Sequence, residues 1–409
     1  MRDADAVSAR SSSASHSHPS ASHPGPPGAA VTAGPPLAPL VPRYGESTLA
    51  DVATSILASL GIPGEANPLG LAEVSRACLL VIDGLGWELL REHQAAAPFL
   101  SELAMSGRPL TAGFPATTVT SLSSLGTGLP PGQHGMLGYQ VAVPGTGRLL
   151  NALRWDKRVD PMTWQPAPTI FERAAVAGVA AFRVAQGAYR DSGLSTAVMR
   201  GALYRSADTL GALAGQAAAA LAGEPRALAM VYEAGLDSTG HAYGCSSESW
   251  RFQLGHVDRL AEQLAGALPP GTALYVTADH GMVDVTAADR IDADARPELR
   301  DGVAILGGEP RARHVYAKAG AAADVLGTWR EVLGPSAWVV SRDEAISEGW
   351  FGPVDAGLAS RIGDVVAACA GQAAVVASRA EPREAALVGM HGSMASSDQL
   401  VPLLAYGLA

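Results

Sequence analysis

Side chains that can bind metal ions stand directly after several apolar segments of the chain. They are three aspartates and three histidines: Asp83, Asp237, His241, Asp279, His280 and His391. Carboxylate oxygens and imidazole nitrogens are ligands that two closely spaced divalent transition metals prefer. Taken alone, Asp83 is also typical of a turn or helix cap, and Asp237 with His241 of an ordinary i, i+4 helical contact. The combination predicts a metal centre if the fold brings these residues together.

A hydroxyl-rich segment is the second candidate for chemistry. Residues 113–128 read GFPATTVTSLSSLGTG, and the apolar residues after Thr118 recur at helical spacing until glycines end the pattern. In this register Thr118 occupies the N-cap or the first turn, where unpaired N–H groups and the helix dipole favour an anion. This position makes Thr118 the preferred hydroxyl for chemistry, with Thr117 as its rival and Thr120 and Ser121 as further alternatives.

An α/β framework is expected to position these residues. Four apolar runs have the pattern of buried parallel strands that open into loops: 77–86, 179–185, 227–237 and 272–281. Helix-prone segments lie before and between them: 47–60, 210–222 and 250–268. This alternation predicts a mostly parallel central sheet covered by helices on both faces, a three-layer α/β/α sandwich. Residues at the carboxyl ends of such strands face one crevice.

The chain is expected to have a tail and one catalytic domain. Residues 1–43 are rich in Ala, Ser, Pro and His and are expected to be disordered, because they cannot bury enough apolar surface. Residues 44–409 form the predicted domain. Within it, residues 285–352 change in character and are expected to be a small β-α-β insertion over the site, or else further strands of the main sheet.

Composition narrows the partners and the compartment. The net charge of −10 and the lack of a long basic cluster argue against binding to a nucleic-acid polymer. Three widely spaced cysteines fit reduced thiols in a cytoplasmic protein better than a disulfide framework. The sequence has no uninterrupted apolar run of about 18 residues and no apolar centre of a secretory signal, so no membrane segment is expected.

The ordered motifs resemble the alkaline phosphatase superfamily, and within it the type I phosphodiesterase/nucleotide pyrophosphatase family. The resemblance runs from about Leu79 to the C-terminus and rests on D-x-x-G-H at Asp237, D-H-G-M at Asp279 and a distant H-G at His391. It implies an alkaline phosphatase-like fold and a metal-dependent phosphoesterase. It also implies two divalent metal ions, usually zinc. The expected substrate is a small phosphodiester or nucleotide pyrophosphate.

The resemblance also implies a ligand set for each metal. One ion would be held by Asp237, His241 and His391. The other would be held by the oxygen of the nucleophile together with Asp83, Asp279 and His280. Two metals can stabilise the attacking and the leaving oxygens of an in-line displacement at phosphorus, and a metal-bound hydroxyl has a lowered pKa.

The chain departs from the family pattern at two places. The nucleophile usually precedes F-P, but Gly113 holds that position here; counting nine residues back from Thr127 of the closing T-G pair gives Thr118 instead. An Asn that helps to hold a phosphoryl oxygen is replaced by Tyr139, which could donate one hydrogen bond or be a core aromatic. Arg154 is a further candidate phosphate contact, or else a surface residue.

Other functions use parts of the same pattern. A phosphomonoesterase or phosphonate hydrolase would need the same metals, and a non-catalytic metal-binding scaffold on this fold is the alternative from another class. A sulfatase is disfavoured, because the sequence has no C-x-P-x-R or S-x-P-x-R motif. A cofactor-independent phosphoglycerate mutase would need a Ser nucleophile and a large inserted domain, and neither is evident.

Overall fold

The computed structural model describes residues 38–407. Most of the predicted disordered tail, residues 1–37, lies outside the described residues. Residues 38–43 lie against the folded chain, where the Leu40 N–H donates to the Met394 carbonyl over 2.9 Å. In the described part, no helix is long and apolar enough to cross a membrane.

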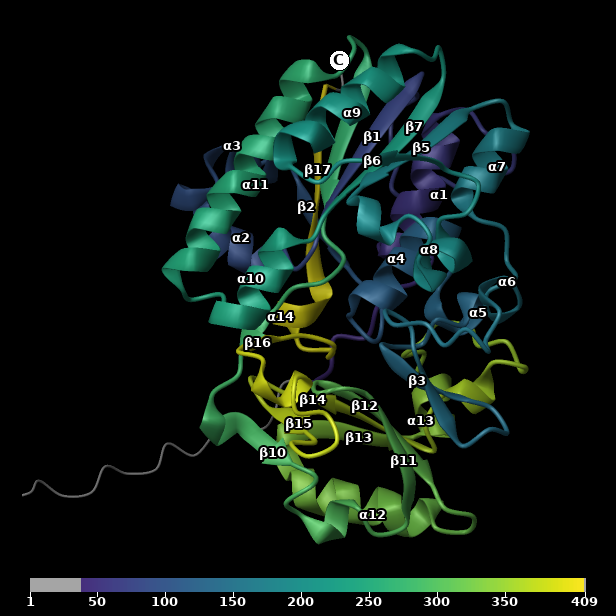
Figure 1. Cartoon of the computed structure of the whole chain (residues 1–409), viewed down its shortest axis with the longest axis vertical. Coiled ribbons are helices and arrows are strands. Elements are labelled where there is room, and N and C mark those ends of the chain that lie inside the picture. Colours follow the sequence, from purple (N-terminus) through teal and green to yellow (C-terminus); the bar gives the residue numbers. More distant parts are fainter. Residues whose placement is uncertain (1–37, 408–409) are drawn as a thin grey trace, which may run out of the picture. The chain divides into compact units, whose positions relative to one another are not determined.

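A seven-stranded sheet forms the centre of the fold (Figure 1). Its strands in spatial order are β2 (Arg108–Thr111), β17 (Leu400–Tyr406), β8 (Thr272–Thr277), β1 (Arg76–Ile82), β7 (Ala227–Glu233), β5 (Ala180–Ala185) and β6 (Leu203–Ser206). Strands β8, β1, β7, β5 and β6 pair in parallel, whereas β17 runs antiparallel to both of its neighbours. The prediction of a mostly parallel central sheet is confirmed.

Helices cover both faces of this sheet, which confirms the predicted three-layer arrangement. One group contains α3 (Pro98–Ala104), α9 (Leu210–Ala222) and α11 (Glu248–Ala267), and the other contains α1 (Leu49–Ser59), α4 (Thr118–Thr127) and α7 (Ile170–Val176). Helix α11 contacts α9 and α3, while α1, α4 and α7 contact one another. Figure 1 shows the two groups on opposite sides of the sheet. Every residue of β7 is buried, as expected for a strand covered on both faces.

Helix α4 packs closely against α8 (Gly193–Val198). A Cβ added to Gly126 would lie 2.1 Å from the Val198 carbonyl oxygen, so only glycine fits this contact. Gly128 ends the helix in the left-handed conformation with φ of 69°. Close packing and the glycine cap thus fix the C-terminal end of α4.

A second, four-stranded antiparallel sheet follows the main one along the chain. It consists of β11 (Val303–Glu309), β12 (Ala312–Ala317), β14 (Val365–Cys369) and β13 (Ala337–Ser341). Helix α12 (Ala322–Leu333) packs on this sheet with Trp329 at the centre of a separate apolar cluster. The sheet overlaps the predicted segment 285–352 and extends past it to Cys369. Its description as an insertion domain stays a prediction.

Shorter elements connect and brace the two sheets. They are α2 (Trp87–Glu92), α5 (Pro131–His134), β3 (Gln140–Val143), β4 (Arg148–Asn151), α6 (Pro161–Trp164), α10 (Gly235–Tyr243), β9 (Val283–Asp284), β10 (Arg290–Asp292), α13 (Arg342–Ser347), β15 (Ala374–Val376), β16 (Gly389–Met390) and α14 (Ser396–Gln399). Strand β16 pairs with β9, which begins shortly after β8. This pairing brings the segment near His391 to the carboxyl edge of the central sheet.

Candidate metal centre and nucleophile

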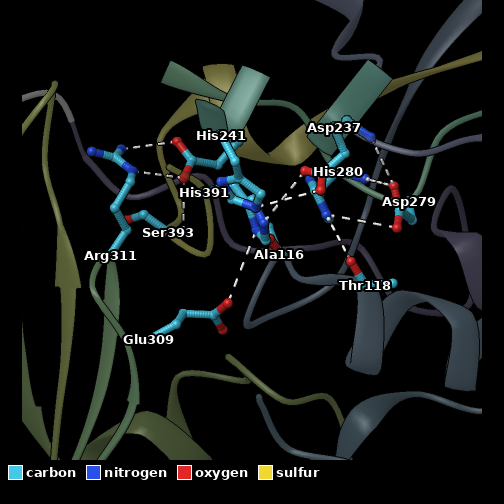
Figure 2. A network of polar contacts seen from close by, with 12 residues as sticks. Ala116, Thr118, Asp237, His241, Asp279, His280, Glu309, Arg311, His391 and Ser393 are labelled. Atoms are coloured by element: carbon cyan, nitrogen blue, oxygen red, sulfur yellow. Dashed lines mark hydrogen bonds and ion pairs between the residues drawn. The ribbon is translucent and has the colours of Figure 1, made fainter. Parts of the chain in front are cut away.

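The predicted metal ligands converge at the carboxyl edge of three neighbouring parallel strands. Asp83 follows β1, Asp279 and His280 follow β8, and helix α10 after β7 carries the remaining aspartate. His391 comes from the loop after β16, on the other side of the cluster (Figure 2). Residues more than 300 positions apart in the sequence therefore share one site.

The six side chains form two groups of three. One group is Asp83, Asp279 and His280, and the other is Asp237, His241 and His391; within each group, one potential ligand atom from every residue lies within 4.8 Å of the others. The two groups adjoin each other, because the rings of His280 and His391 stack with their centroids 3.6 Å apart. The division is the same as the one implied by the family resemblance.

The first group surrounds the Nε2 atom of His280. This nitrogen lies 3.3 Å from Asp83 Oδ1 and 3.6 Å from Asp279 Oδ2. It also lies 3.3 Å from Thr118 Oγ1, so the candidate nucleophile belongs to the same group (Figure 2). Both aspartates and His280 are buried. A cation in this group would be surrounded by protein oxygen and nitrogen.

The second group has Asp237 at its centre. Its Oδ2 lies 3.4 Å from His241 Nε2, and its Oδ1 lies 3.8 Å from His391 Nε2. Asp237 and His241 are one helical turn apart in α10, which places both side chains on the same face of the helix. The i, i+4 spacing therefore places both side chains in the second ligand group.

Hydrogen bonds orient all three histidine rings in the same way. In each ring Nδ1 faces a backbone carbonyl: His241 that of Gly389 at 2.7 Å, His280 that of Gly281 at 2.9 Å and His391 that of Ala116 at 3.0 Å. A carbonyl only accepts, so Nδ1 must donate and Nε2 keeps its lone pair for the centre of the site. This arrangement is typical of histidines that bind a metal through Nε2.

The carboxylates show that the site suits positive ions. Asp83 Oδ1, Asp237 Oδ1 and Asp279 Oδ2 are buried and have no hydrogen-bond partner among the described residues. Burial raises the pKa of all three carboxyls; for Asp279, burial together with the charge of Asp83 raises the pKa to about 8. Three crowded carboxylates without cations are unfavourable, so the donor set fits bound metal ions.

The hydroxyls of helix α4 differ in their access to this centre. Thr118 is the first residue of the helix and half-buried, whereas Thr117 is the N-cap residue and 3% exposed. Thr120 and Ser121 are fully buried, and Thr120 donates to the Met136 carbonyl. The Thr117 side chain does not cap the helix, so the N–H groups of the first turn remain available to an anion beside Thr118.

The predicted substrate contacts, Tyr139 and Arg154, line a cleft that opens on Thr118. The cleft has a volume of ≈ 300 Å³ and is also lined by His241 and His391. The Tyr139 hydroxyl donates to Glu384 Oε1 over 3.1 Å, and Arg154 is exposed at the cleft wall. Both residues are thus placed beside the metal centre, although more than 80 residues separate either of them from His241 in the sequence.

Three residues that the sequence did not single out also lie at the site. Glu309 of β11 is buried, and its Oε2 lies 4.0 Å from His391 Nδ1 (Figure 2). Burial raises the pKa of this carboxyl to about 8. Tyr232 of β7 donates its hydroxyl to Asp83 Oδ2, and the Arg183 guanidinium lies 4.9 Å from the centroid of the Tyr232 ring. Of these three residues, Arg183 could have been noticed in the sequence, because it is a charged residue inside an apolar, strand-like run.

Comparison with known proteins identifies a family for most of the chain. The family model described as Type I phosphodiesterase / nucleotide pyrophosphatase matches residues 77–394. A search of curated proteins gives no match.

Similar solved structures have the same fold. Human ectonucleotide pyrophosphatase / phosphodiesterase 5 is 20% identical with a TM-score of 0.64, and the match covers 82% of this chain and 88% of that one. An inactive variant of the murine protein, in complex with AMP, is 17% identical with a TM-score of 0.65 and coverages of 81% and 88%. Phosphonoacetate hydrolase from Sinorhizobium meliloti 1021, in complex with phosphonoformate, is 20% identical with a TM-score of 0.62 and coverages of 81% and 89%.

Proposed function

The chain belongs to the type I phosphodiesterase/nucleotide pyrophosphatase family, and we propose that it hydrolyses phosphodiester or nucleotide pyrophosphate bonds through a covalent phospho-threonine at Thr118. Family membership makes it a metal-dependent phosphoric ester hydrolase; the nucleophile and the type of bond are our proposal. The observation that carries the proposal is the position of the Thr118 hydroxyl, 3.3 Å from His280 Nε2 and at the edge of the cleft beside the metal centre.

We assign two zinc ions to the two groups of ligands. Asp237, His241 and His391 would hold one ion. Asp83, Asp279, His280 and the Thr118 oxygen would hold the other. The unpartnered carboxylate oxygens and the Nε2 atoms of the histidines support this assignment, and zinc is a common choice for such oxygen and nitrogen ligands. When bound, the ions supply Lewis-acid stabilisation and lower the pKa of the Thr118 hydroxyl.

In the proposed reaction, Thr118 supplies the attacking oxygen. Its hydroxyl proton passes to solvent, Oγ1 forms a bond to phosphorus, and the bond from phosphorus to the leaving oxygen breaks. The N–H groups of the first turn of α4 face the negative charge that develops on the phosphoryl group. A water molecule then attacks the phospho-threonine, the bond from phosphorus to Oγ1 breaks, and the Thr118 hydroxyl is restored.

Two substitutions test the nucleophile. Thr118→Ala should remove nearly all turnover, because no other hydroxyl of α4 lies in the same position. Thr117→Ala, the matched control from the adjacent residue, should keep most of it. Steady-state hydrolysis of bis-p-nitrophenyl phosphate by the zinc-loaded proteins gives the comparison. The reverse order of activities would show that Thr117 is the nucleophile.

A pair of substrates tests the bond type. We expect faster hydrolysis of bis-p-nitrophenyl phosphate than of p-nitrophenyl phosphate, and a much faster monoester would make the protein a phosphomonoesterase. The structural likeness to phosphonoacetate hydrolase makes phosphonoacetate the next compound to assay. Metal analysis separates an enzyme from a scaffold: about two zinc ions per chain are expected, whereas a folded, metal-free protein would favour the scaffold.

Tyr139 and Arg154 are proposed to contact the substrate in the cleft. Their place beside His241 and His391 supports this role, and Arg154 offers a charge-assisted hydrogen bond to a phosphate oxygen. The proposed substrate is a small phosphate ester or nucleotide. A cytoplasmic location stays a prediction from the cysteine pattern.

A further inference from the structure

Arg183 is a buried cation without an anionic partner. It lies in β5 and is 4% exposed. Among the described residues, no carboxylate lies within 4.0 Å of its guanidinium and no hydrogen-bond acceptor pairs with its buried Nη1. Within residues 38–407, its guanidinium lies against the face of the Tyr232 ring, 4.9 Å from the ring centroid. An unpaired charge in the protein interior is strongly unfavourable, so Arg183 calls for a partner that the described residues do not supply.

Arg183 lines a second cavity that also reaches the metal centre. This cavity has a volume of ≈ 260 Å³, and Thr118, Asp83 and Asp237 line it together with Arg183 and Tyr189. It adjoins the cleft of His241 and His391, which do not line it, and the two spaces share Leu153 and Asp237 as well as Thr118. Thr118 borders both spaces. A substrate whose phosphorus lies at Thr118 can therefore place one substituent in each.

The walls of the cavity have a mixed character. Apolar side chains form much of its surface: Leu122, Leu153, Leu194, Val198 and Met199. Asp83 and Asp237, the acidic residues of the lining, belong to the proposed metal ligands. Arg183 is consequently the one charged group of the lining that is left for the substrate. Such a space suits an apolar body that ends in an anionic group.

We propose that this cavity binds the substituent that stays on phosphorus, and that Arg183 pairs with a carboxylate or phosphate at the end of that substituent. The inference rests on the proposed function, since it requires phosphorus at Thr118. In an in-line displacement the leaving group departs on the side opposite to the Thr118 oxygen. We place that side in the cleft lined by His241 and His391, because the Thr118 hydroxyl lies against the other ligand group, 3.3 Å from His280 Nε2. The other cavity is thus available to the group that is retained.

The chemistry of arginine favours this pairing. A guanidinium presents N–H donors that match the two oxygens of a carboxylate or phosphate, and a desolvated pair of this kind is stronger than one in water. Arg183 could also act only through Tyr232, whose hydroxyl holds Asp83, and it would then be a positioning residue. The two roles differ in one respect: only direct pairing makes the effect of Arg183 depend on the charge of the substituent.

Ligand binding to the zinc-loaded Thr118→Ala protein distinguishes these roles without turnover. The probes are phenyl phosphate, 4-carboxyphenyl phosphate and 4-phosphonophenyl phosphate, with dissociation constants from isothermal titration calorimetry. The two acidic probes should bind roughly 10- to 100-fold more tightly than phenyl phosphate, as expected for hydrogen bonds to a charged group. The tighter of the two tells whether the natural group is a carboxylate or a phosphate.

Substitutions in the same background complete the test. Arg183→Met should remove the preference for acidic probes and leave phenyl phosphate within about 3-fold, while Arg183→Lys should keep part of it. Arg205→Met is the matched control, because Arg205 lies on the neighbouring strand β6, stacks on Phe182 and does not line the cavity. An equal loss for all three probes, or a preference that survives Arg183→Met, would overturn the inference. Diester hydrolysis by the wild-type protein tests the proposed function separately.

Discussion

Replacing Asp398 by Asn should destabilise the protein strongly, because Asp398 neutralises a fully buried arginine. Both side chains of the Arg311–Asp398 pair are 0% exposed. The pair is bidentate, with Nε to Oδ1 at 2.8 Å and Nη2 to Oδ2 at 2.9 Å. Asp398 also accepts from the Ser393 N–H at 3.0 Å, two residues beyond His391. The pair therefore holds the second sheet and the loop of a proposed metal ligand together.

The magnitude follows from what remains after the change. Asn keeps one acceptor oxygen, which can still accept from the Ser393 N–H and from Arg311 Nε, but it carries no charge and no longer accepts from Nη2. Arg311 also keeps its bonds to the carbonyls of Gly371 and Ala373. Removing one partner of a buried ion pair costs about 3–5 kcal/mol, because the other charge stays buried and uncompensated. We expect about 3 kcal/mol for Asp398→Asn, the low end, since the hydrogen bond to Ser393 can survive.

Denaturant unfolding of the zinc-loaded protein measures this loss. Glu262→Gln is the control: it breaks the exposed ion pair with Arg259 on α11 and should change the free energy of unfolding by less than about 1 kcal/mol. Adding Arg311→Met to Asp398→Asn removes both charges and should recover part of the loss. Two results would refute the electrostatic explanation. One is a loss below about 1 kcal/mol for Asp398→Asn. The other is a double variant whose loss equals the sum of the losses of Asp398→Asn and Arg311→Met measured singly.

Three further predictions concern the metals, the packing of α4 and a buried carboxyl. Chelation should abolish diester hydrolysis and lower the melting temperature, and zinc should restore both; activity that survives complete metal removal would contradict the two-metal site. Gly126→Ala should destabilise the protein in thermal unfolding, because its Cβ would lie 2.1 Å from the Val198 carbonyl oxygen, whereas Gly211→Ala, on a helix surface with no atom within 4 Å, should not. Burial raises the pKa of Glu309 in the folded state from 4.5 to about 8, so between these pH values the folded state binds a proton that the unfolded state has lost. In metal-free protein, the free energy of unfolding of wild type relative to Glu309→Gln should therefore fall as the pH rises from 4.5 to about 8. A constant difference in unfolding free energy between pH 5 and pH 9 would contradict this prediction.

Most of the main sheet could be predicted because its parallel strands are recognisable from short, local stretches of sequence. The parallel strands β1, β5, β7 and β8 are continuous apolar runs, and such runs are buried on both faces in any order of pairing. Strand β17 was not predicted, although it lies in the same sheet. Pro402 interrupts its run, and proline normally argues against a central strand. In the structure Pro402 lies opposite Pro109 of β2, and pairing with β8 begins only at Leu403, so the missing N–H is tolerated there.

The convergence of the proposed metal ligands could be predicted for a related reason. Their types, and their position after apolar runs, are properties of the sequence, and the parallel order of β1, β7 and β8 brings most of them together. The contribution of the second sheet could not be found in this way. Glu309 lies close to His391 because β11 packs beside the loop after β16. Neither segment has a sequence pattern that predicts this contact.

Arg183 could be noticed in the sequence, but its role could not be predicted from it. A charge in the middle of the run VAAFRVA is visible in the sequence, and it conflicts with the burial that the rest of the run predicts. Such a conflict can be resolved by a protein partner, as Asp398 does for Arg311, but the sequence does not say where a partner would come from. Only the structure shows that Arg183 lines a cavity together with Asp83 and Asp237, the two carboxylates that we propose as metal ligands. Arg183 is a buried charge without a partner among the described residues, and it lines the same cavity as the proposed nucleophile Thr118. It is therefore better explained by an anionic group of the substrate than by the stability of the strand.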